Sequence, residues 1–552
     1  MALKHAGQVI ADALHRQGVD LIFGVPGESF LPVLDGLFTY EKEMRFITSR
    51  HESGASFMAE AYGKLTGKPG VLMVTRGPGA SNASIGIHTA LQDSTPMVVL
   101  IGQVGTDMAE REAFQEVDYR RMFGESAKWV GSIDKAERID EYISRAFHLA
   151  QSGRPGPVVL ALPEDVLFAQ VESKPVEKAH VVRPGLNQAE FKKALELLKS
   201  AQKPIVLVGG GGWTAKACLA LDEWLKKENL PAATAFRFQD LIDADHPCYA
   251  GDLGIAPNPK LAQRVKDADV VLAIGPRLGE MTSGMYTLFE VPVTKQKLIH
   301  VHMGTSELGS VYRPEIAINS SYEDFCVALN QNTLNLKLTS EFQGASAHQE
   351  YLAFNQSLES QSDLNMAEIV SRLNEFLPAD AIVTNGAGNF AGWVHRFYRY
   401  GGLGQYGRTQ LAPTNGAMGY GLPAAIAAKL QSPERVVIGF CGDGDFMMSC
   451  QELATCMRYD VYPIIVVVNN GMLGTIRMHQ EREYSKRVIA TQLANPDFVM
   501  FAQSFGMPGF KITKTADFFL ALESALASKK GAVIEVVTDP EQITPTKRMS
   551  EL

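Results

Sequence analysis

Short apolar runs alternate with helical patterns along most of the chain and fall into three stretches. This alternation is typical of parallel α/β layers, in which a helix follows each buried strand and covers the sheet. The first stretch spans residues 1–168, the second 186–337 and the third 363–540. We therefore predict an α/β protein with three doubly wound parallel-sheet domains at these bounds.

The strongest strand candidates are short and mostly apolar. They are GVLMVT, PMVVLIGQV and PVVLALP in the first stretch, PIVLVGGGG, DVVLAIG and LIHVH in the second, and AIVTN, RVVIGF, PIIVVVNN and AVIEVV in the third. Residues 169–185 carry Lys, Glu and Pro and predict a surface linker. Residues 338–362, rich in Ser, Gln and Thr, predict either a second linker or a loosely packed helix. The polar tail 541–552 is expected on the surface.

Composition narrows the class of protein. The chain has 552 residues and a formal net charge of −9, which argues against nucleic acid or an anionic membrane as the partner. Its longest apolar runs fall well short of the about 20 residues that a membrane span needs, and its N-terminus is amphipathic rather than a signal peptide. The cysteines lack metal-site spacing and predict buried, reduced thiols in a cytoplasmic protein. They are Cys218, Cys248, Cys326, Cys441, Cys450 and Cys456.

The sharpest motif is a Gly442-Asp443-Gly444 turn that follows a buried strand. A helical pattern then opens near Phe446 and carries Met448, Leu453 and Met457 on its apolar face. A helix that starts at a Gly-rich turn offers free backbone N–H groups and the positive end of its dipole, which suits a diphosphate.

A second apolar strand ends in Asn469-Asn470-Gly471, and Asn470 lies 27 positions after Asp443. That spacing fits a strand–helix–strand crossover, which would bring both turns to the same edge of a parallel sheet. A carboxylate and an amide oxygen suit Mg²⁺ or Ca²⁺, with phosphate oxygens completing the shell. Either turn alone could be a simple connection, but the pair at this spacing indicates a cofactor site.

This GDG and NN pair resembles the thiamine diphosphate signature of the acetolactate synthase and pyruvate oxidase group. The resemblance covers nearly the whole chain and is closest to acetolactate synthase large subunits. It implies pyrimidine-binding, central Rossmann-like and diphosphate-binding domains. Asp445 stands where that group usually has a small neutral residue, and a carboxylate near a diphosphate is unfavourable unless it points away. The implied metal ligands are Asp443, Asn470 and the carbonyl of Met472, with Gly442, Gly444, Asp445, Leu473 and Gly474 around the cofactor.

Glu52 lies in a segment, HES-GAS-MA-AYG, that matches the glutamate motif of the same group. A charged residue at a helix start is otherwise usually a cap. The resemblance implies that Glu52 protonates the aminopyrimidine ring of the cofactor, for which a buried carboxyl with a raised pKa is suited.

Other segments of the first stretch match the group as well. The resemblance implies that the early loop places Val25 and Pro26 against the aminopyrimidine. It implies that a Gly-rich turn, residues 76–82, forms a wall of the site with Thr75 and Asn82, although such a turn alone could be a simple connection. It also implies that the FQE segment sets Gln115 on the substrate side. Lys128 falls where acetolactate synthases carry a lysine near the site entrance, and a solvated lysine is the alternative.

In the third stretch, residues 415–423 resemble the segment in which a Met wedges the cofactor into a bent shape and a Gly carbonyl accepts from its exocyclic amine. These are Met418 and Gly416, and the bend brings the reacting groups within proton-transfer reach. The turn 385–390 implies diphosphate contacts from Asn385, Gly386 and Asn389, where acetolactate synthases often have Gln or His-Gln.

Arg277 stands where acetolactate synthases have an Arg that meets the acceptor carboxylate, and a guanidinium forks well onto such a group. The FAD-contacting RFDDR pattern of those enzymes reads RLGEM from Arg277, and the loss of both Asp argues against FAD. Residues 209–212 lack GxGxxG spacing. His479 aligns with a Trp that sets acceptor size, and it is either a substrate ligand or a rim or core histidine.

The resemblance implies a thiamine diphosphate and Mg²⁺ enzyme that condenses two pyruvates with loss of CO₂. The alternatives are a decarboxylase or lyase of another 2-oxo acid or 2-hydroxyacyl thioester, and a non-catalytic paralogue that binds the cofactor. The group also implies a homodimer or homotetramer with active sites between chains, and a possible small regulatory subunit.

Overall fold

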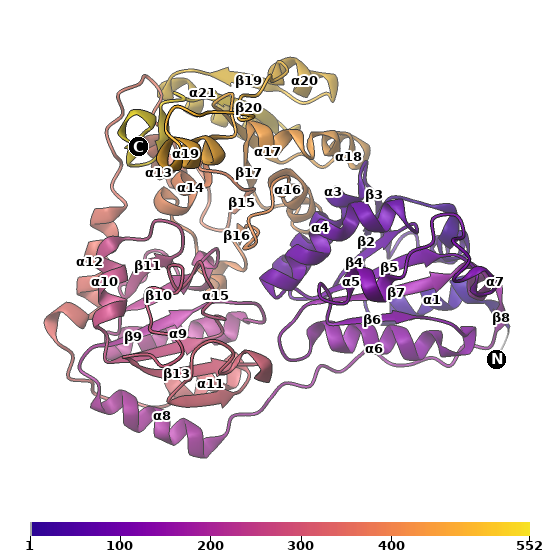
Figure 1. The fold of residues 1–552 in the computed structure, drawn as a ribbon, viewed down its shortest axis with the longest axis horizontal. Coiled ribbons are helices and arrows are strands. Elements are labelled where there is room, and N and C mark those ends of the chain that lie inside the picture. The colour runs from indigo at the N-terminus through magenta and orange to yellow at the C-terminus, as the bar shows by residue number, and fades with distance from the viewer. Residues whose placement is uncertain (1–2) are drawn as a thin grey trace. The chain divides into compact units, whose positions relative to one another are not determined.

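The computed structural model describes residues 3–552, which form two compact units (Figure 1). The first unit comprises residues up to Val182 together with 422–432 and 448–461, and the second comprises the remaining segments from Arg183 to Leu552. The first contains one six-stranded sheet and the second contains two. All strand pairs within these three sheets are parallel, so the predicted three-sheet α/β architecture is confirmed.

Helices cover both faces of the sheet of the first unit, and its inner strands β4 (Gly70–Val74), β5 (Met97–Gln103) and β7 (Pro157–Pro163) are therefore buried on both sides. Met73 and Leu100 face a core that includes residues of α1 (Ala6–Arg16) and α6 (Ile139–Gln151). Their neighbours along each strand point to the opposite face. The strand order is β3 (Arg45–Thr48), β2 (Leu21–Gly24), β4, β5, β7 and β6 (Trp129–Ser132). Other helices of this unit are α2 (Leu31–Phe38), α3 (Glu52–Thr66), α4 (Pro78–Asp93) and α16 (Gly421–Gln431).

The second unit holds a central and a third sheet. The central order is β11 (Tyr249–Leu253), β10 (Ala232–Ala235), β9 (Pro204–Val208), β12 (Val270–Ile274), β13 (Lys297–His302) and β14 (Ile316–Asn319). The third order is β16 (Gln410–Leu411), β15 (Ile382–Asn385), β17 (Val437–Gly442), β18 (Ile464–Asn469), β20 (Ala532–Val537) and β19 (Gly509–Ile512). Its helices include α8 (Gln188–Ser200), α9 (Ala215–Glu228), α10 (Pro259–Asp267), α11 (Tyr322–Asn330), α13 (Met366–Phe376), α14 (Ala391–Phe397), α19 (Gly474–Glu483), α20 (Phe498–Ser504) and α21 (Thr515–Ala527).

Three local expectations need correction. Residues 344–354 form helix α12 (Gly344–Phe354), and His348 and Tyr351 are buried, so this helix is packed rather than loose. The tail is not wholly on the surface, because it forms a β21–β22 hairpin (Gln542–Thr544 and Lys547–Arg548) in which Ile543 is buried.

The helix after the GDG turn is also interrupted. It splits into α17 (Asp443–Met447) and α18 (Leu453–Tyr459), joined by a 3₁₀ turn at Cys450–Glu452. Met448 and Met457 are each 53% exposed, so their predicted apolar face is wrong. The break changes the helical phase, and α18 buries Leu453, Thr455 and Cys456.

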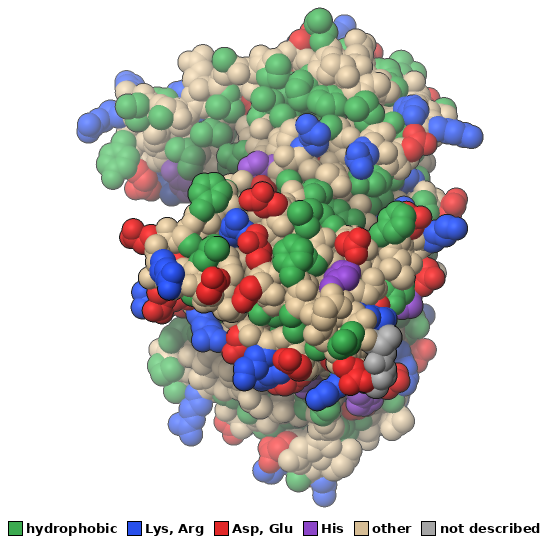
Figure 2. Space-filling view, turned by 90° about the vertical axis from the view of Figure 1, so that its right-hand side faces the viewer, with side chains coloured by type: hydrophobic (Ala, Val, Ile, Leu, Met, Phe, Trp, Pro, Cys, Tyr) green, Lys and Arg blue, Asp and Glu red, His purple; other side chains and the backbone are tan. Residues whose placement is uncertain are grey.

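All six cysteines are buried and reduced, as the composition predicts. Figure 2 shows acidic and basic side chains interspersed over the face that it presents. Across residues 3–552, we find no helix whose length and apolar character would let it span a bilayer.

Candidate functional site

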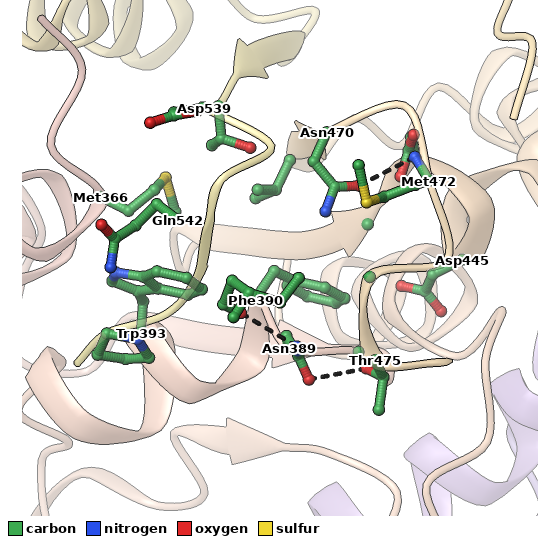
Figure 3. A pocket seen from close by; sticks show the side chains of 18 of the residues that line it. Met366, Asn389, Phe390, Trp393, Asp445, Asn470, Met472, Thr475, Asp539 and Gln542 are labelled. Atoms are coloured by element: carbon green, nitrogen blue, oxygen red, sulfur yellow. Dashed lines mark hydrogen bonds between the residues drawn. The ribbon is translucent and has the colours of Figure 1, made fainter. Parts of the chain in front are cut away.

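The two predicted turns meet at the carboxyl edge of the third sheet. Gly442 at the end of β17 pairs in register with Val468 of β18, so the residues that follow both strands lie side by side. They line a cavity of about 300 Å³ (Figure 3). Predicted residues that line it are Asn389, Gly416, Met418, Gly442, Asp443, Gly444, Asp445, Asn470, Met472, Leu473 and Gly474.

Asp443 is a buried carboxylate, only 3% exposed, at the floor of this edge. Its Oδ2 accepts from the Gly471 N–H at 3.0 Å and from Asn495 Nδ2 at 2.7 Å. Burial raises the pKa of Asp443, and these donors partly oppose the rise. Asn495 was missed in the sequence, because it lies in an irregular segment with no motif around it.

Asn470 and Met472 supply further oxygens. Asn470 Oδ1 accepts from the Met472 N–H at 3.2 Å (Figure 3). The Met472 carbonyl accepts from the Gly474 N–H at 3.0 Å. Each oxygen has a second lone pair for another partner. Within the described residues, no three His, Cys, Asp or Glu side chains converge as metal ligands. The donor set here is instead one carboxylate, one amide and one carbonyl, which are hard oxygens that fit Mg²⁺.

The Asp445 carboxylate is hydrogen-bonded to the protein backbone. Its Oδ1 accepts from the Gly419 N–H at 2.5 Å, and a Cβ on Gly386 would lie 2.2 Å from both carboxylate oxygens. Burial raises the pKa of Asp445 to about 7, against lowering by the N–H groups of Gly419 and Ala387. Asp445 therefore ties together turns around the cavity, and only a residue without a side chain fits at position 386.

In the turn after β15, Asn389 lines the cavity and Asn385 does not. Asn385 is fully buried, where its Nδ2 donates to the Gly386 carbonyl at 2.8 Å and its Oδ1 contacts His395 Nε2 at 3.1 Å. It supports the turn from behind. Asn389 lines the cavity, but Thr475 Oγ1 donates to its Oδ1 at 2.8 Å and its Nδ2 donates to the Ile543 carbonyl at 3.0 Å (Figure 3).

In the first unit, Glu52 is the first residue of α3, and His51 caps the helix by accepting from the Ser53 N–H at 3.2 Å. Asn82 of α4 donates to Glu52 Oε2 at 2.9 Å. Glu52 is half-buried and Asn82 is exposed in the single chain, so the buried carboxyl expected for Glu52 is not present in this state.

The other residues predicted near Glu52 lie on turns that contact one another. Gly27 follows Val25 and Pro26 and lies close to Thr75. A Cβ added to Gly27 would lie 2.5 Å from the Cβ of Thr75. Gln115 has a left-handed φ of 67° and contacts Gly77, whose φ is 52°. The adjacent Phe114 is 74% exposed.

Three predicted substrate-side residues are not among those that line the cavity at the third sheet. Lys128 Nζ donates at 2.5 Å to the carbonyls of Leu149 and Ser152 at the end of α6, and desolvation of the ammonium lowers the pKa of Lys128 to about 8. Arg277 follows β12 in the second unit and is half-buried. His479 is exposed on α19, where its Nδ1 accepts from Arg482 at 2.9 Å.

The central sheet has its topological switch point between β9 and β12, where nucleotides commonly bind. The turns that follow these strands touch through their backbones. A Cβ on Gly210 would lie 2.4 Å from the Gly275 carbonyl oxygen, and Trp213 Nε1 donates to the Gly209 carbonyl at 2.9 Å. The two turns therefore pack closely against each other.

Comparison with known proteins gives this arrangement a family. Models of the thiamine pyrophosphate enzymes match in three parts: the N-terminal TPP binding domain at residues 4–122, the central domain at 191–329 and the C-terminal TPP binding domain at 386–536. The chain belongs to the thiamine pyrophosphate enzymes, and it acts in carbon–carbon bond chemistry with that cofactor.

Among its relatives are acetolactate synthase large subunits. The chain is 32% identical to the acetolactate synthase isozyme 2 large subunit of Escherichia coli K12, over 97% of this chain and 96% of the relative. It is 32% identical to the large subunit of Parasynechococcus marenigrum, over 96% and 86%. It is 30% identical to the mitochondrial catalytic subunit of Saccharomyces cerevisiae, over 97% and 80%.

Proposed function

We propose that this enzyme condenses two molecules of pyruvate with loss of CO₂, the reaction for which its acetolactate synthase relatives are named. The supporting observation is that Asp443, Asn470 and Met472, which carry a carboxylate, an amide and a carbonyl oxygen, line one cavity beside the Gly442 and Gly444 turn. We also propose that residues 1–168, 186–337 and 363–540 are the pyrimidine-binding, central and diphosphate-binding domains.

Mg²⁺ would be held by Asp443, the Asn470 amide oxygen and the Met472 carbonyl. A cation there offsets the cost of burying the Asp443 carboxylate. The backbone around Gly444, Leu473 and Gly474 would bind the diphosphate, with Asp445 held away from it by the Gly419 N–H.

Thiamine diphosphate, when bound, supplies a carbon nucleophile and an electron sink for decarboxylation. Glu52 would hold the proton at the pyrimidine nitrogen, and Asn82 would orient its carboxyl through the 2.9 Å hydrogen bond. Val25, Pro26 and Thr75 would form the wall on this side. Met418 and the Gly416 carbonyl, both at the cavity, would hold the bent cofactor.

On the substrate side, we propose that Arg277 binds the acceptor carboxylate, because a guanidinium matches that group bidentately. Gln115 would orient the substrate from its turn. For Lys128 to take part, its ammonium must first leave the carbonyls of Leu149 and Ser152.

No flavin is required in this proposal. The loss of both Asp after Arg277 supports its absence. The purified protein is expected to show no flavin absorbance, and activity that depends on added FAD would reject this part.

A second candidate is a decarboxylase or lyase that uses another 2-oxo acid or a 2-hydroxyacyl thioester. His479 favours it, because by resemblance it stands where acetolactate synthases have a Trp that sets acceptor size, and a polar ring there changes which acceptor or acyl group binds. Mass identification of the products from pyruvate separates the two: acetolactate supports the first function, and acetaldehyde or no product supports the second.

The role of Glu52 is tested by Glu52→Gln. Thiamine diphosphate affinity, measured by titration, should stay close to wild type, while turnover should fall by about 10²–10⁴-fold, the usual contribution of a positioned acid–base group. Glu177→Gln is a matched control on the linker of the same unit. Wild-type turnover of the Glu52 variant would contradict the assignment.

For assembly, we propose a homodimer or homotetramer in the cytoplasm, with a possible small regulatory subunit as the "large subunit" names of its relatives suggest. The half-buried Glu52 and exposed Asn82 support completion of the site on association. Light scattering is expected to give at least a dimer, and a fully active monomer would reject this.

A further inference from the structure

The segment 448–461 follows the GDG turn in the chain yet belongs to the first unit. It carries Glu452, which is fully buried. Glu452 Oε1 accepts from the N–H groups of Arg50 at 3.1 Å and His51 at 3.0 Å. Its Oε2 accepts from Arg50 N–H at 3.2 Å and from Thr455 Oγ1 at 2.6 Å. Arg50 and His51, whose N–H groups bond to Glu452, directly precede Glu52 in the chain.

These hydrogen bonds fix the backbone at the start of α3. His51 is the N-cap with an extended backbone, φ −149° and ψ 143°, from which the helix begins at Glu52. With the N–H groups of residues 50 and 51 fixed, the direction of the first helical residue is fixed too. The Glu52 carboxyl then lies where Asn82 can donate to it.

The fit between Glu452 and α3 is tight. A Cβ on Gly54 would lie 2.5 Å from Glu452 Oε1, so the carboxylate reaches the first turn only because residue 54 has no side chain. Burial raises the pKa of Glu452, and the surrounding donors oppose this. Burying a carboxylate costs far more than burying an apolar side chain of equal size, so packing alone does not account for this residue.

A second contact from the same segment acts further from Glu52. Tyr459 Oη accepts from the Thr48 N–H at 2.7 Å and donates to the Phe46 carbonyl at 3.0 Å. It holds the end of β3 but does not contact residues 50 or 51 through any described hydrogen bond. Tyr459 therefore provides a matched control for general loosening of the β3–α3 connection.

We infer that Glu452 is a positioning residue for Glu52: its carboxylate fixes the backbone of Arg50 and His51 and thereby aims the Glu52 carboxyl. The inference rests on the proposed role of Glu52. Glu452 lies nine positions after Asp443 in the chain. The segment that follows the proposed metal ligand would therefore also position Glu52.

The test compares Glu452→Gln with Tyr459→Phe in the enzyme loaded with thiamine diphosphate and Mg²⁺. Glutamine keeps the size but places an NH₂ group against one of the backbone donors. Amide hydrogen exchange at Arg50 and His51 should become faster in Glu452→Gln. Turnover should fall about 100-fold, as for a misplaced catalytic group, with little change in the KM for pyruvate or in cofactor affinity.

Tyr459→Phe should speed exchange at Thr48 alone and keep near-wild-type turnover. An equal loss of turnover in both variants would show a merely structural role and overturn the inference. So would unchanged exchange and turnover in Glu452→Gln. If the glutamine variant does not fold, Gly54→Ala disturbs the same contact from the α3 side and should give the same pattern.

Failure of the two ideas can be told apart. If Glu52→Gln retains full turnover, the proposed catalytic role of Glu52 is wrong, whatever the amides of residues 50 and 51 do. If Glu52→Gln loses turnover while Glu452→Gln keeps it, only the positioning role of Glu452 is wrong.

Discussion

Asn495 Nδ2 lies 2.7 Å from Asp443 Oδ2 and donates a hydrogen bond to it. The same amide group lies 3.1 Å from Asn469 Oδ1, so Asn495 bridges the residues that follow β17 and those that end β18. Asp443 is the proposed metal ligand, and the bridge fixes which of its oxygens is left for a cation. Partners of this kind orient a ligand and tune its metal affinity.

We therefore predict that Asn495→Ala raises the Mg²⁺ concentration for half-maximal activity by about 10–100-fold, the usual effect of losing a residue that orients a metal ligand. The measurement is a Mg²⁺ titration at saturating thiamine diphosphate. Asn374→Ala, which removes a hydrogen bond to the Arg399 carbonyl away from the cavity, is the control. An unchanged midpoint in Asn495→Ala would show that the bridge does not orient the ligand.

Gly386 and Asp445 are predicted to be coupled. A methyl group at position 386 would lie 2.2 Å from both Asp445 oxygens, so Gly386→Ala should lower the free energy of unfolding by about 1–3 kcal/mol, as overpacking does. Asp445→Ser makes room, and the double variant should recover part of that loss. Denaturant unfolding of the four proteins gives the coupling, and strictly additive losses would exclude the contact.

Asp222 should make stability fall as pH rises. Burial raises its pKa from the ordinary 3.8 to about 8, and its Oδ1 has no hydrogen-bond partner within residues 3–552. Between these values the unfolded chain has released the proton that the folded chain keeps, so stability declines with pH. Asp222→Asn should unfold at higher denaturant than wild type at pH 8, with a flatter pH profile. Parallel profiles for the two proteins would refute the pKa shift.

The buried pair Lys64 and Asp93 is predicted to be costly to break. Lys64 Nζ lies 2.5 Å from Asp93 Oδ2, with side chains only 3% and 0% exposed. Asp93→Ala should destabilise the protein by about 3–5 kcal/mol, because it leaves the ammonium buried without this carboxylate. Thermal or urea unfolding measures the loss, and the exposed pair of Lys193 with Glu190 serves as control. A double replacement of Lys64 and Asp93 by Met and Leu should lose less than Asp93→Ala alone.

The strands predicted from sequence are the inner ones of each sheet. The runs that gave β4, β5 and β7, or β9, β12 and β13, are buried on both faces and therefore read as continuous apolar segments. The strands without a clear signal lie toward the sheet margins, such as β3, β6 and β16, which are short or partly exposed. Where one face is solvated or only two residues pair, local composition carries little information.

The candidate site divides in the same way. The GDG and NN turns were predictable, because parallel strands bring their carboxyl ends to one edge whatever the surroundings. The roles of Asn495 and Glu452 could not be predicted. Asn495 bonds to Asp443 and Glu452 bonds to His51, each across many residues of chain and without a local motif. The split of the helix after Asp443 was also missed, because the apolar spacing of Met448, Leu453 and Met457 fits an unbroken helix.

Sequence by itself determined the architecture, because hydrophobic period is a local property that the fold must respect. The resemblance of its GDG and NN turns to a known signature identified the cofactor class. Only the tertiary structure decided how individual groups are used: that Asp445 faces the Gly419 N–H, that Asn389 is bound to Thr475 and Ile543, and that Lys128 caps α6. Those outcomes depend on which distant donors and acceptors packing brings together, and no short stretch of sequence contains that information.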